Sequence, residues 1–298
     1  MSSLLAVLID GVMHAAWLFT IAVGLTLIYG VMKILNMAHG SFYAFGAYCC
    51  ATALGQYFAA GLPPMGAFLA IFMSALIGGI LLGLIVERGI LRLFGGRDPI
   101  VMLLVTYALF LVLEDAIKLI WGVDPYIVGE PLGLLGVVKI GTLVYPGYNF
   151  LVVVVAVLVC VVLTSFLQQT AYGKILRAVI HDPEVSSTLG INVTRWSLVA
   201  FITGSVLAAL GGALTAPTIS VVPGMAVEVV VMMFAVVVIG GLGSIPGTII
   251  GALVVGLVRS AAVHFWPEVE LFSIYAVMAL VLVVKPKGLF AGMELRKI

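Results

Sequence analysis

Long apolar runs separated by short polar segments occupy the whole chain. Nine of these runs are candidate membrane-spanning helices, at residues 4–29, 41–60, 65–86, 100–121, 148–167, 197–215, 227–239, 248–264 and 271–284. A helix needs about 20 apolar residues to cross the roughly 30 Å of bilayer hydrocarbon. The seventh run is too short to do so alone, so it either borrows the flanking glycines or forms half of a broken helix. The pattern predicts an all-α, polytopic transmembrane bundle of about eight to nine spans.

The composition excludes a soluble fold. Of the 298 residues, 63% are hydrophobic and 9% are charged, whereas soluble domains have about 45–50% apolar and about 25% charged residues. A soluble core cannot enclose so much apolar surface. We therefore expect residues 1–298 to form one multi-pass membrane domain. The net charge of +1 argues against a nucleic-acid partner.

Lysine and arginine residues gather in alternate loops between the apolar runs. One side holds eleven of the 14 basic residues, namely Lys33, Arg88, Arg92, Arg97, Lys174, Arg177, Arg195, Lys285, Lys287, Arg296 and Lys297. Basic residues favour the cytoplasmic side of a membrane protein. The asymmetry predicts an N-terminus outside the cytoplasm and a cytoplasmic C-terminus. The loop 168–196 is then cytoplasmic, and the glycine- and proline-rich loop 122–147 is external, with ordered turns at most.

The most polar part of the cytoplasmic loop reads AYGKILRAVIHDPEVSSTLGIN, from residue 171 to residue 192. Residues 172–180 carry their apolar side chains on one helical face, which favours a short helix lying in the membrane interface. Next, Asp182 stands where an N-cap belongs and Pro183 where the first helical residue belongs. Gly190 is placed to end that second helix in a left-handed conformation. The sequence predicts two short helices with a break at His181 and Asp182.

Two interpretations of this loop are open from its residues. It is either a solvated connector or a docking element for a partner. Val185, Leu189 and Ile191 favour docking, because apolar groups exposed among charged residues usually meet another protein.

Two further segments carry polar or conformationally special residues near the ends of apolar runs. Asn36, His39 and Ser41 surround Gly40, either as ligand contacts or as helix caps. Glycine or alanine recurs every four residues in two sets, Gly204, Ala208 and Gly212, and Gly243, Gly247 and Gly251. Small residues at this spacing favour close helix packing. Alternatively, Pro246 and the glycines beside it unwind the backbone and expose carbonyl groups to a substrate path.

Ionisable residues inside the apolar runs are few. Asp10 and His14 lie one helical turn apart, and Glu114, Asp115 and Arg259 stand alone among apolar neighbours. Such residues either extend to the membrane surface or mark a function. An Asp10–His14 proton relay would suit a proton-coupled secondary transporter or a channel for a small polar solute, with Glu114 or Asp115 as further proton carriers.

Three segments together resemble one family of transport proteins. Glu184-Val185-Ser186-Ser187-Thr188-Leu189-Gly190 keeps the Glu and the Gly of the E-A-A-x-x-x-G loop found in ABC importer permeases, with Val and Ser in place of the two alanines. The other two segments are similar to those of LivH-type permeases for branched-chain amino acids. One is 24–42, with its turn Leu35-Asn36-Met37-Ala38-His39-Gly40-Ser41-Phe42. The other is Gly240-Gly241-Leu242-Gly243-Ser244-Ile245-Pro246-Gly247. Permeases for urea and short-chain amides share these features.

The resemblance implies a multi-pass permease subunit of the bacterial inner membrane, which is not itself an enzyme. It implies a heterodimer with a homologous LivM-type permease, two cytoplasmic ABC ATPases and a periplasmic solute-binding protein. The chain would hold no cofactor or metal, because ATP is hydrolysed by the partner subunits, and the sequence contains no GxxxxGK[ST] phosphate-binding loop. The expected ATPase-coupling residues are Arg177, Asp182, Pro183, Glu184, Leu189 and Gly190. The expected substrate-path residues are Asn36, His39, Ser41, Gly243, Ser244 and Pro246.

Overall fold

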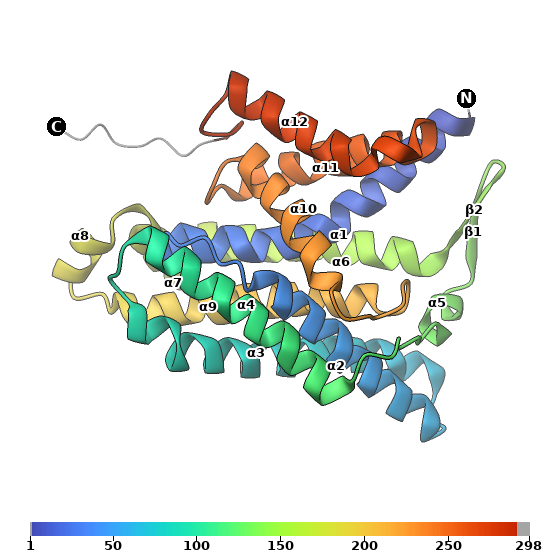
Figure 1. Cartoon of the computed structure of the whole chain (residues 1–298), viewed down its shortest axis with the longest axis horizontal. Helices are drawn as coiled ribbons and strands as arrows, with labels where there is room; N and C mark the ends of the chain where they lie inside the picture. The colour runs from blue at the N-terminus through green and yellow to red at the C-terminus, as the bar shows by residue number, and fades with distance from the viewer. Residues whose placement is uncertain (1, 291–298) are drawn as a thin grey trace.

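Helices form nearly all of the structure, a computed structural model that describes residues 2–290 (Figure 1). The helices are α1 (Ser2–Met32), α2 (His39–Ala59), α3 (Ala67–Gly89), α4 (Pro99–Trp121), α5 (Glu130–Leu134), α6 (Gly147–Gln169), α7 (Ala171–His181), α8 (Pro183–Thr188), α9 (Val193–Thr215), α10 (Met225–Gly240), α11 (Ile245–Phe265) and α12 (Glu270–Val284). Short 3₁₀ turns lie at Pro64–Gly66, Leu91–Phe94 and Pro267–Val269, and one hairpin pairs β1 (Val137–Ile140) with β2 (Leu143–Pro146).

Seven helical segments are long and apolar enough to cross a membrane among the described residues: α1, α3 with its flanking 3₁₀ turns, α4, α6, α9, α11, and α12 with the 3₁₀ turn that precedes it, Pro267–Val284 together. This confirms an all-α, polytopic membrane protein. The other two apolar runs form α2, which has 21 residues, and α10, which has 16. The prediction that the seventh run is unusually short for a span is therefore confirmed in α10.

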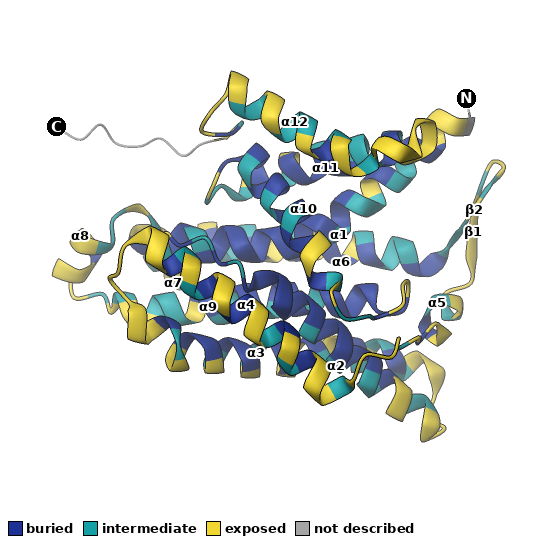
Figure 2. Cartoon of the chain, viewed as in Figure 1, coloured by how far each residue is buried: buried dark blue, intermediate teal, exposed yellow. Residues whose placement is uncertain are grey.

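The core of the bundle is built around α1 and α9. Of the most apolar stretch of each helix, 83% is buried in α1 and 67% in α9, compared with 6% in α12. The outward faces of α3, α4, α6 and α12 expose large apolar side chains, including Leu69, Ile85, Leu104, Leu119, Val154 and Val283. Figure 2 shows these faces as bands of exposed residues around a buried centre. Such faces are stable against lipid and would be unfavourable in water.

Glycine contacts hold the core helices together. A Cβ atom on Gly204 of α9 would collide with Gly24 of α1, and a Cβ atom on Gly212 of α9 would collide with the backbone of Tyr43 in α2. Gly247 and Gly251 of α11 meet the α10 backbone at Gly240 and Val236 in the same way. Both predicted small-residue sets therefore mediate helix packing.

Gly243 is the exception within those sets. It precedes α11 and has a left-handed φ of +80°, so it belongs to the turn between α10 and α11. A Cβ atom on Gly243 would lie 3.5 Å from Cα of Gly30, at the end of α1. Its contact partner is thus α1 rather than α10.

The loop 122–147 contains more regular structure than the expected turns. It holds α5 and an antiparallel hairpin in which Val138 pairs with Tyr145 and Ile140 with Leu143. The β-branched residues of this stretch suit a strand, and Gly141, with φ of +63°, forms the tight turn between the strands. The expectation of turns alone was wrong because it weighed the glycines and prolines above the valines between them.

The packing predicts opposite effects for two glycines of α2. Gly46 faces the backbone of Ala209 in α9, whereas Gly55 has no atom within 4 Å of an added Cβ. Gly46→Ala should therefore overpack the α2–α9 contact and cost about 1–3 kcal/mol. Gly55→Ala should be neutral or stabilise by about 0.5–1 kcal/mol, because alanine is the better helix former.

Thermal unfolding of the two purified variants in the same detergent measures this difference. The melting temperature should fall for Gly46→Ala and stay level or rise for Gly55→Ala. Equal melting temperatures would show that α2 and α9 do not pack as described.

Candidate functional site

The α7 helix is fixed to the bundle along one face. Thr170 caps its start, with the Gly173 N–H donating to Thr170 Oγ1 at 2.9 Å. Leu176 and Val179 are buried, and Gly173 packs directly on the α6 backbone. The side chain of Ile180 lies beside Gly30, near the end of α1. The predicted amphipathic helix is confirmed, and it connects α6 to α1.

The α8 helix is capped at both ends by the residues that the sequence indicates. Asp182 Oδ1 accepts a hydrogen bond from the Val185 N–H at 2.9 Å, and Pro183 occupies the first helical position. Gly190 has φ of +83°. The Gly190 N–H donates to the Ser187 carbonyl and the Ile191 N–H to the Ser186 carbonyl, both at 3.0 Å, which completes a Schellman motif. The break between α7 and α8 is where the sequence predicts it.

The outer surface of α8 is unusually open for a segment with apolar side chains. Val185 is 53% exposed and Leu189 is 75% exposed. Glu184 and Arg177 are exposed beside them, whereas Ser186 is buried. In Figure 1 α8 projects from one end of the bundle. A groove of about 480 Å³ lies alongside, lined by Ile175, Gly190, Ile191, Asn192, Arg195, Trp196 and Val199.

Five of the six expected coupling residues, Asp182, Pro183, Glu184, Leu189 and Gly190, lie on α8 or at its ends, and Arg177 lies on the preceding helix α7. α8 is anchored through its ends, and its exposed face combines apolar and charged groups. That arrangement suits a docking helix better than a solvated connector.

The expected substrate-path residues of the first turn are deeply buried. Lys33, which follows α1, adopts a left-handed φ of 55°, and α2 begins at His39 after a short irregular segment. Asn36, His39 and Ser41 are each 0% exposed. The N-cap of α2 is Ala38, without a side-chain hydrogen bond. The capping alternative for Asn36 and Ser41 is therefore wrong.

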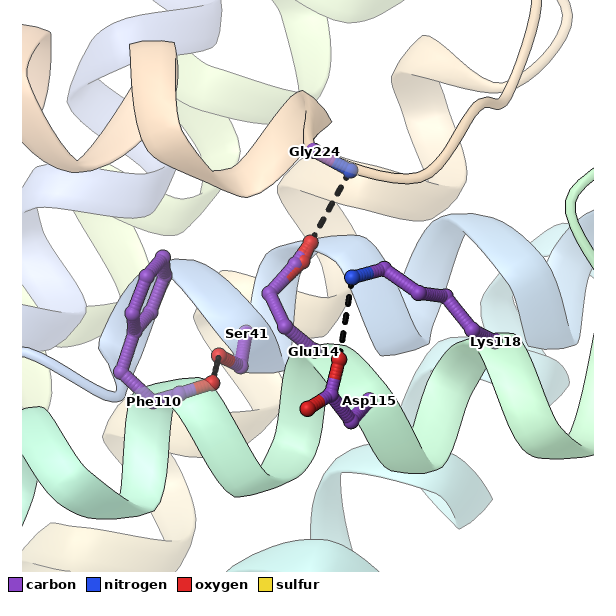
Figure 3. A network of polar contacts seen from close by, with 6 residues as sticks. All are labelled: Ser41, Phe110, Glu114, Asp115, Lys118 and Gly224. Atoms are coloured by element: carbon purple, nitrogen blue, oxygen red, sulfur yellow. Dashed lines mark hydrogen bonds and ion pairs between the residues drawn. The ribbon is translucent and has the colours of Figure 1, made fainter.

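These three side chains have few hydrogen-bond partners. His39 Nε2 lies 3.1 Å from the Ile21 carbonyl oxygen, and Ser41 Oγ donates to the Phe110 carbonyl at 3.4 Å (Figure 3). Both polar side-chain atoms of Asn36 and Nδ1 of His39 have no hydrogen-bond partner among the described residues. Buried polar groups are normally paired, so these atoms mark a place where the chain encloses unsatisfied polarity.

The backbone of the same turn is satisfied by α4. Thr106 Oγ1 accepts a hydrogen bond from the Met37 N–H at 3.2 Å. It donates to the Leu35 carbonyl oxygen, also at 3.2 Å. Because a buried backbone group without a partner is costly, an irregular segment enclosed among helices needs such a partner.

The second expected group, Gly243, Ser244 and Pro246, forms the start of α11. Ser244 Oγ accepts a hydrogen bond from the Gly247 N–H at 3.1 Å, and Pro246 lies in the first turn. The group lies beside Gly30, whereas His39 contacts Ile21, more than two helical turns earlier on α1. The six residues thus occupy two separate places along α1.

A large cavity lies elsewhere, between α1, α2, α6, α9, α10 and α11. Its volume is about 640 Å³, and none of the six expected substrate-path residues lines it. Its polar side chains include His14, Tyr43, Asn149, Thr215, Glu228 and Arg259. His14 and Arg259 are among the ionisable residues that the sequence pattern singles out, whereas Glu228 is not. The available signal was a single carboxylate inside the seventh apolar run, residues 227–239.

A buried carboxylate fixes one wall of this cavity. Glu114 of α4 is 8% exposed, and its Oε1 accepts a hydrogen bond from the Gly224 N–H at 3.0 Å (Figure 3). Gly224 lines the cavity and is the N-cap of α10, where a negative charge is favoured by the helix dipole. Asp115 points away and pairs with Lys118 at 3.0 Å on an exposed face. The two neighbouring acids therefore have different roles.

Two further ionisable residues, Asp10 and Arg259, pair across helices. Asp10 Oδ2 lies 3.3 Å from Nε2 of His264, and Arg259 Nε donates to Glu270 Oε1 at 2.6 Å. Asp10 thus has its ion-pair contact with α11 rather than with His14. The geometry gives no direct Asp10–His14 relay.

Comparison with known proteins agrees with this architecture. Residues 7–284 match the family described as branched-chain amino acid transport system / permease component. The chain belongs to this family. With its apolar helices, it is a multi-pass integral protein of the bacterial inner membrane.

Two individual relatives match nearly the whole chain, and a third matches part of it. It is 27% identical over 297 residues to the high-affinity branched-chain amino acid transport system permease protein BraD of Pseudomonas aeruginosa, covering 98% of this chain and 97% of BraD. It is 26% identical over 301 residues to LivH of Escherichia coli, covering 97% and 96% of the two chains. The fructose import permease protein FrcC of Rhizobium meliloti is 37% identical over 117 residues, which are 37% of this chain and 32% of FrcC. No solved structure matches.

The capping geometry predicts a local effect of Asp182→Ala. Loss of the N-cap should cost about 0.5–2 kcal/mol and speed amide hydrogen exchange in α8. Asp98→Ala is the matched control, because Asp98 Oδ1 accepts from the Ile100 N–H at 2.8 Å and also precedes a proline at the start of a helix.

Hydrogen exchange of both variants, read by mass spectrometry, separates the two sites. Asp182→Ala should change only the peptides around α8, and Asp98→Ala only those around α4. Unchanged exchange in α8 after Asp182→Ala would mean that the cap does not hold this helix.

Proposed function

We propose that this chain is the transmembrane subunit of an ATP-driven importer for branched-chain amino acids. In this proposal it forms the translocation path as a heterodimer with a homologous permease. Two cytoplasmic ATPases and a periplasmic solute-binding protein complete the importer. The chain itself binds neither ATP nor another cofactor. Family membership supports the permease role, and the full-length similarity to BraD and LivH supports the substrate class.

The observation that carries the proposal is the doubly capped, projecting α8 with its exposed Val185 and Leu189. A short helix held at its ends can receive a push from a docked ATPase without unfolding. A displacement of α8 would pass along α7 to the end of α1, where Ile180 of α7 and Gly243 both lie beside Gly30. It would also pass through the short link 189–192 to α9. Because α1 and α9 form the core, a movement there changes the packing of the whole bundle.

The proposed topology has eight to nine spans. It includes α2 and α10, the two helices that begin inside the bundle. The N-terminus is outside and the C-terminus is cytoplasmic, in keeping with the distribution of basic residues. The β1–β2 hairpin and α8 lie at opposite ends of the bundle in Figure 1. The hairpin then faces the solute-binding protein and α8 faces the ATPases.

Reporter fusions test this topology. Fusions at Gly95, at Gly133 and at the C-terminus should report cytoplasm, outside and cytoplasm respectively, because the basic loops should stay inside. An external Gly95 reporter would reverse the orientation and remove α8 from the ATPases.

A charge reversal on α8 tests the coupling role. Glu184 lies in the first turn of α8, where its negative charge is favoured by about 0.3–1 kcal/mol. Glu184→Lys should leave membrane insertion normal, while ATPase co-purification or ATP-driven leucine uptake is lost. Glu268→Lys, an equal change at an exposed glutamate beyond α11, should leave both intact.

Three results would contradict the proposal. Full transport by Glu184→Lys would remove α8 from coupling. Altered solute selectivity at unchanged rate would place α8 in the substrate path. Uptake driven by a proton gradient in a preparation without ATPases would favour a secondary transporter.

A further inference from the structure

The 640 Å³ cavity contains two opposite charges that the packing of α10 and α11 places across from each other. Gly247 packs on Gly240, and Gly251 packs on Val236, so the two helices run antiparallel in steps of four residues. Two more such steps reach Glu228 on α10 and Arg259 on α11. In Figure 1 α10 runs steeply across the view and α11 runs along its long axis, so the helices separate away from the glycine contacts. Both charged residues line the cavity there.

Neither charge is neutralised by the other. No ion pair joins Glu228 to Arg259, and the Glu228 carboxylate has no hydrogen bond or ion pair within residues 2–290. Arg259 uses its Nε–H for Glu270, and no hydrogen bond to its two terminal nitrogens occurs in the same range. Those terminal groups can bind a carboxylate in the bidentate manner typical of guanidinium.

Tyr43 and Thr215 add hydroxyl groups to the cavity wall. Tyr43 lies on α2 and Thr215 on α9, so they come from different helices than the two charged residues. Few polar groups placed in an apolar pocket are the usual means of orienting a small ligand.

The rest of the wall is apolar. It is formed by side chains that include Met13, Trp17, Val152, Leu214, Ile219, Val222, Met225, Val229 and Met232. Methionine side chains adapt to ligands of irregular shape. The volume lies within the range of about 300–1,000 Å³ for small-molecule sites.

We propose that this cavity is an amino-acid site within the single subunit, with Glu228 binding the ammonium group, Arg259 binding the carboxylate and the apolar wall holding an aliphatic side chain. The inference rests on the proposed import of branched-chain amino acids and assigns its specificity to these two residues. A neutral sugar, such as the cargo in the name of FrcC, would leave the Glu228 carboxylate and the terminal nitrogens of Arg259 without a charged partner from the ligand.

The test is binding of tritiated L-leucine to the purified importer complex without its solute-binding protein. Isopentylamine lacks the carboxylate of leucine, and 4-methylpentanoate lacks its amine, so each competitor probes one charge. Fructose is the neutral competitor. The wild-type complex should bind leucine, and the two analogues should compete while fructose should not.

Glu228→Gln should weaken leucine binding by roughly tenfold or more, the effect of losing a charged hydrogen bond. It should also abolish competition by isopentylamine and preserve competition by 4-methylpentanoate. Arg259→Lys keeps a positive charge opposite Glu270. This variant should selectively weaken competition by 4-methylpentanoate. Glu268→Gln, outside the cavity, is the matched control and should bind all probes like wild type.

The outcomes separate this site from the importer function. If the complex imports leucine with ATP but binds none without the solute-binding protein, the site is wrong and the importer function stands. If leucine binding is intact but no ATP-driven import occurs, the site stands and the importer function is wrong. Unchanged analogue selectivity in Glu228→Gln would overturn the assignment of the ammonium group, even if that variant folded and bound leucine weakly.

Discussion

The structure depends on one constraint, which is that lipid cannot satisfy a backbone N–H or C=O group. Long helices meet it internally, but this chain interrupts its helices inside the bundle. At each interruption a side chain or a second strand supplies the missing partners. Thr106 serves the turn before α2, Glu114 serves the start of α10 at Gly224, and Ser244 caps α11. The link before α10 is also paired through Val221 and Tyr126.

The same constraint explains why the glycine contacts matter for function. With helices held at backbone distance by Gly204 on Gly24 and Gly247 on Gly240, the core has little room to deform within a helix. Closely packed interiors transmit displacement rather than absorb it. A force on α8 would therefore reach the interruptions, which are held by a few side-chain hydrogen bonds and by the Tyr126–Val221 bridge. Movement is directed to the turns because the helices between them are rigid.

Local signals account for what the sequence predicts well. Asp182, Pro183 and Gly190 specify α8 because capping depends on neighbours only a few residues away. Small residues at a spacing of four also predict close helix contacts, because the spacing is a local feature of one helix. The spacing does not identify the helix that is contacted. For that reason it groups Gly243 with the helix-packing glycines, although Gly243 lies in a turn that contacts α1. The cavity was missed because its wall joins six helices distant in sequence.

The two charged residues of the cavity are brought together by the fold and not by their positions in the sequence. In the sequence, Glu228 and Arg259 are two isolated ionisable residues in separate apolar runs. Each alone would be costly in a membrane and would need a partner. Antiparallel packing of α10 and α11 brings both to one cavity, where Glu270 accepts only from the Nε–H of Arg259 and Glu228 has no ion pair among the described residues. A zwitterion can pair with both groups at once, because its ammonium group complements the Glu228 carboxylate and its carboxylate complements the terminal nitrogens of Arg259.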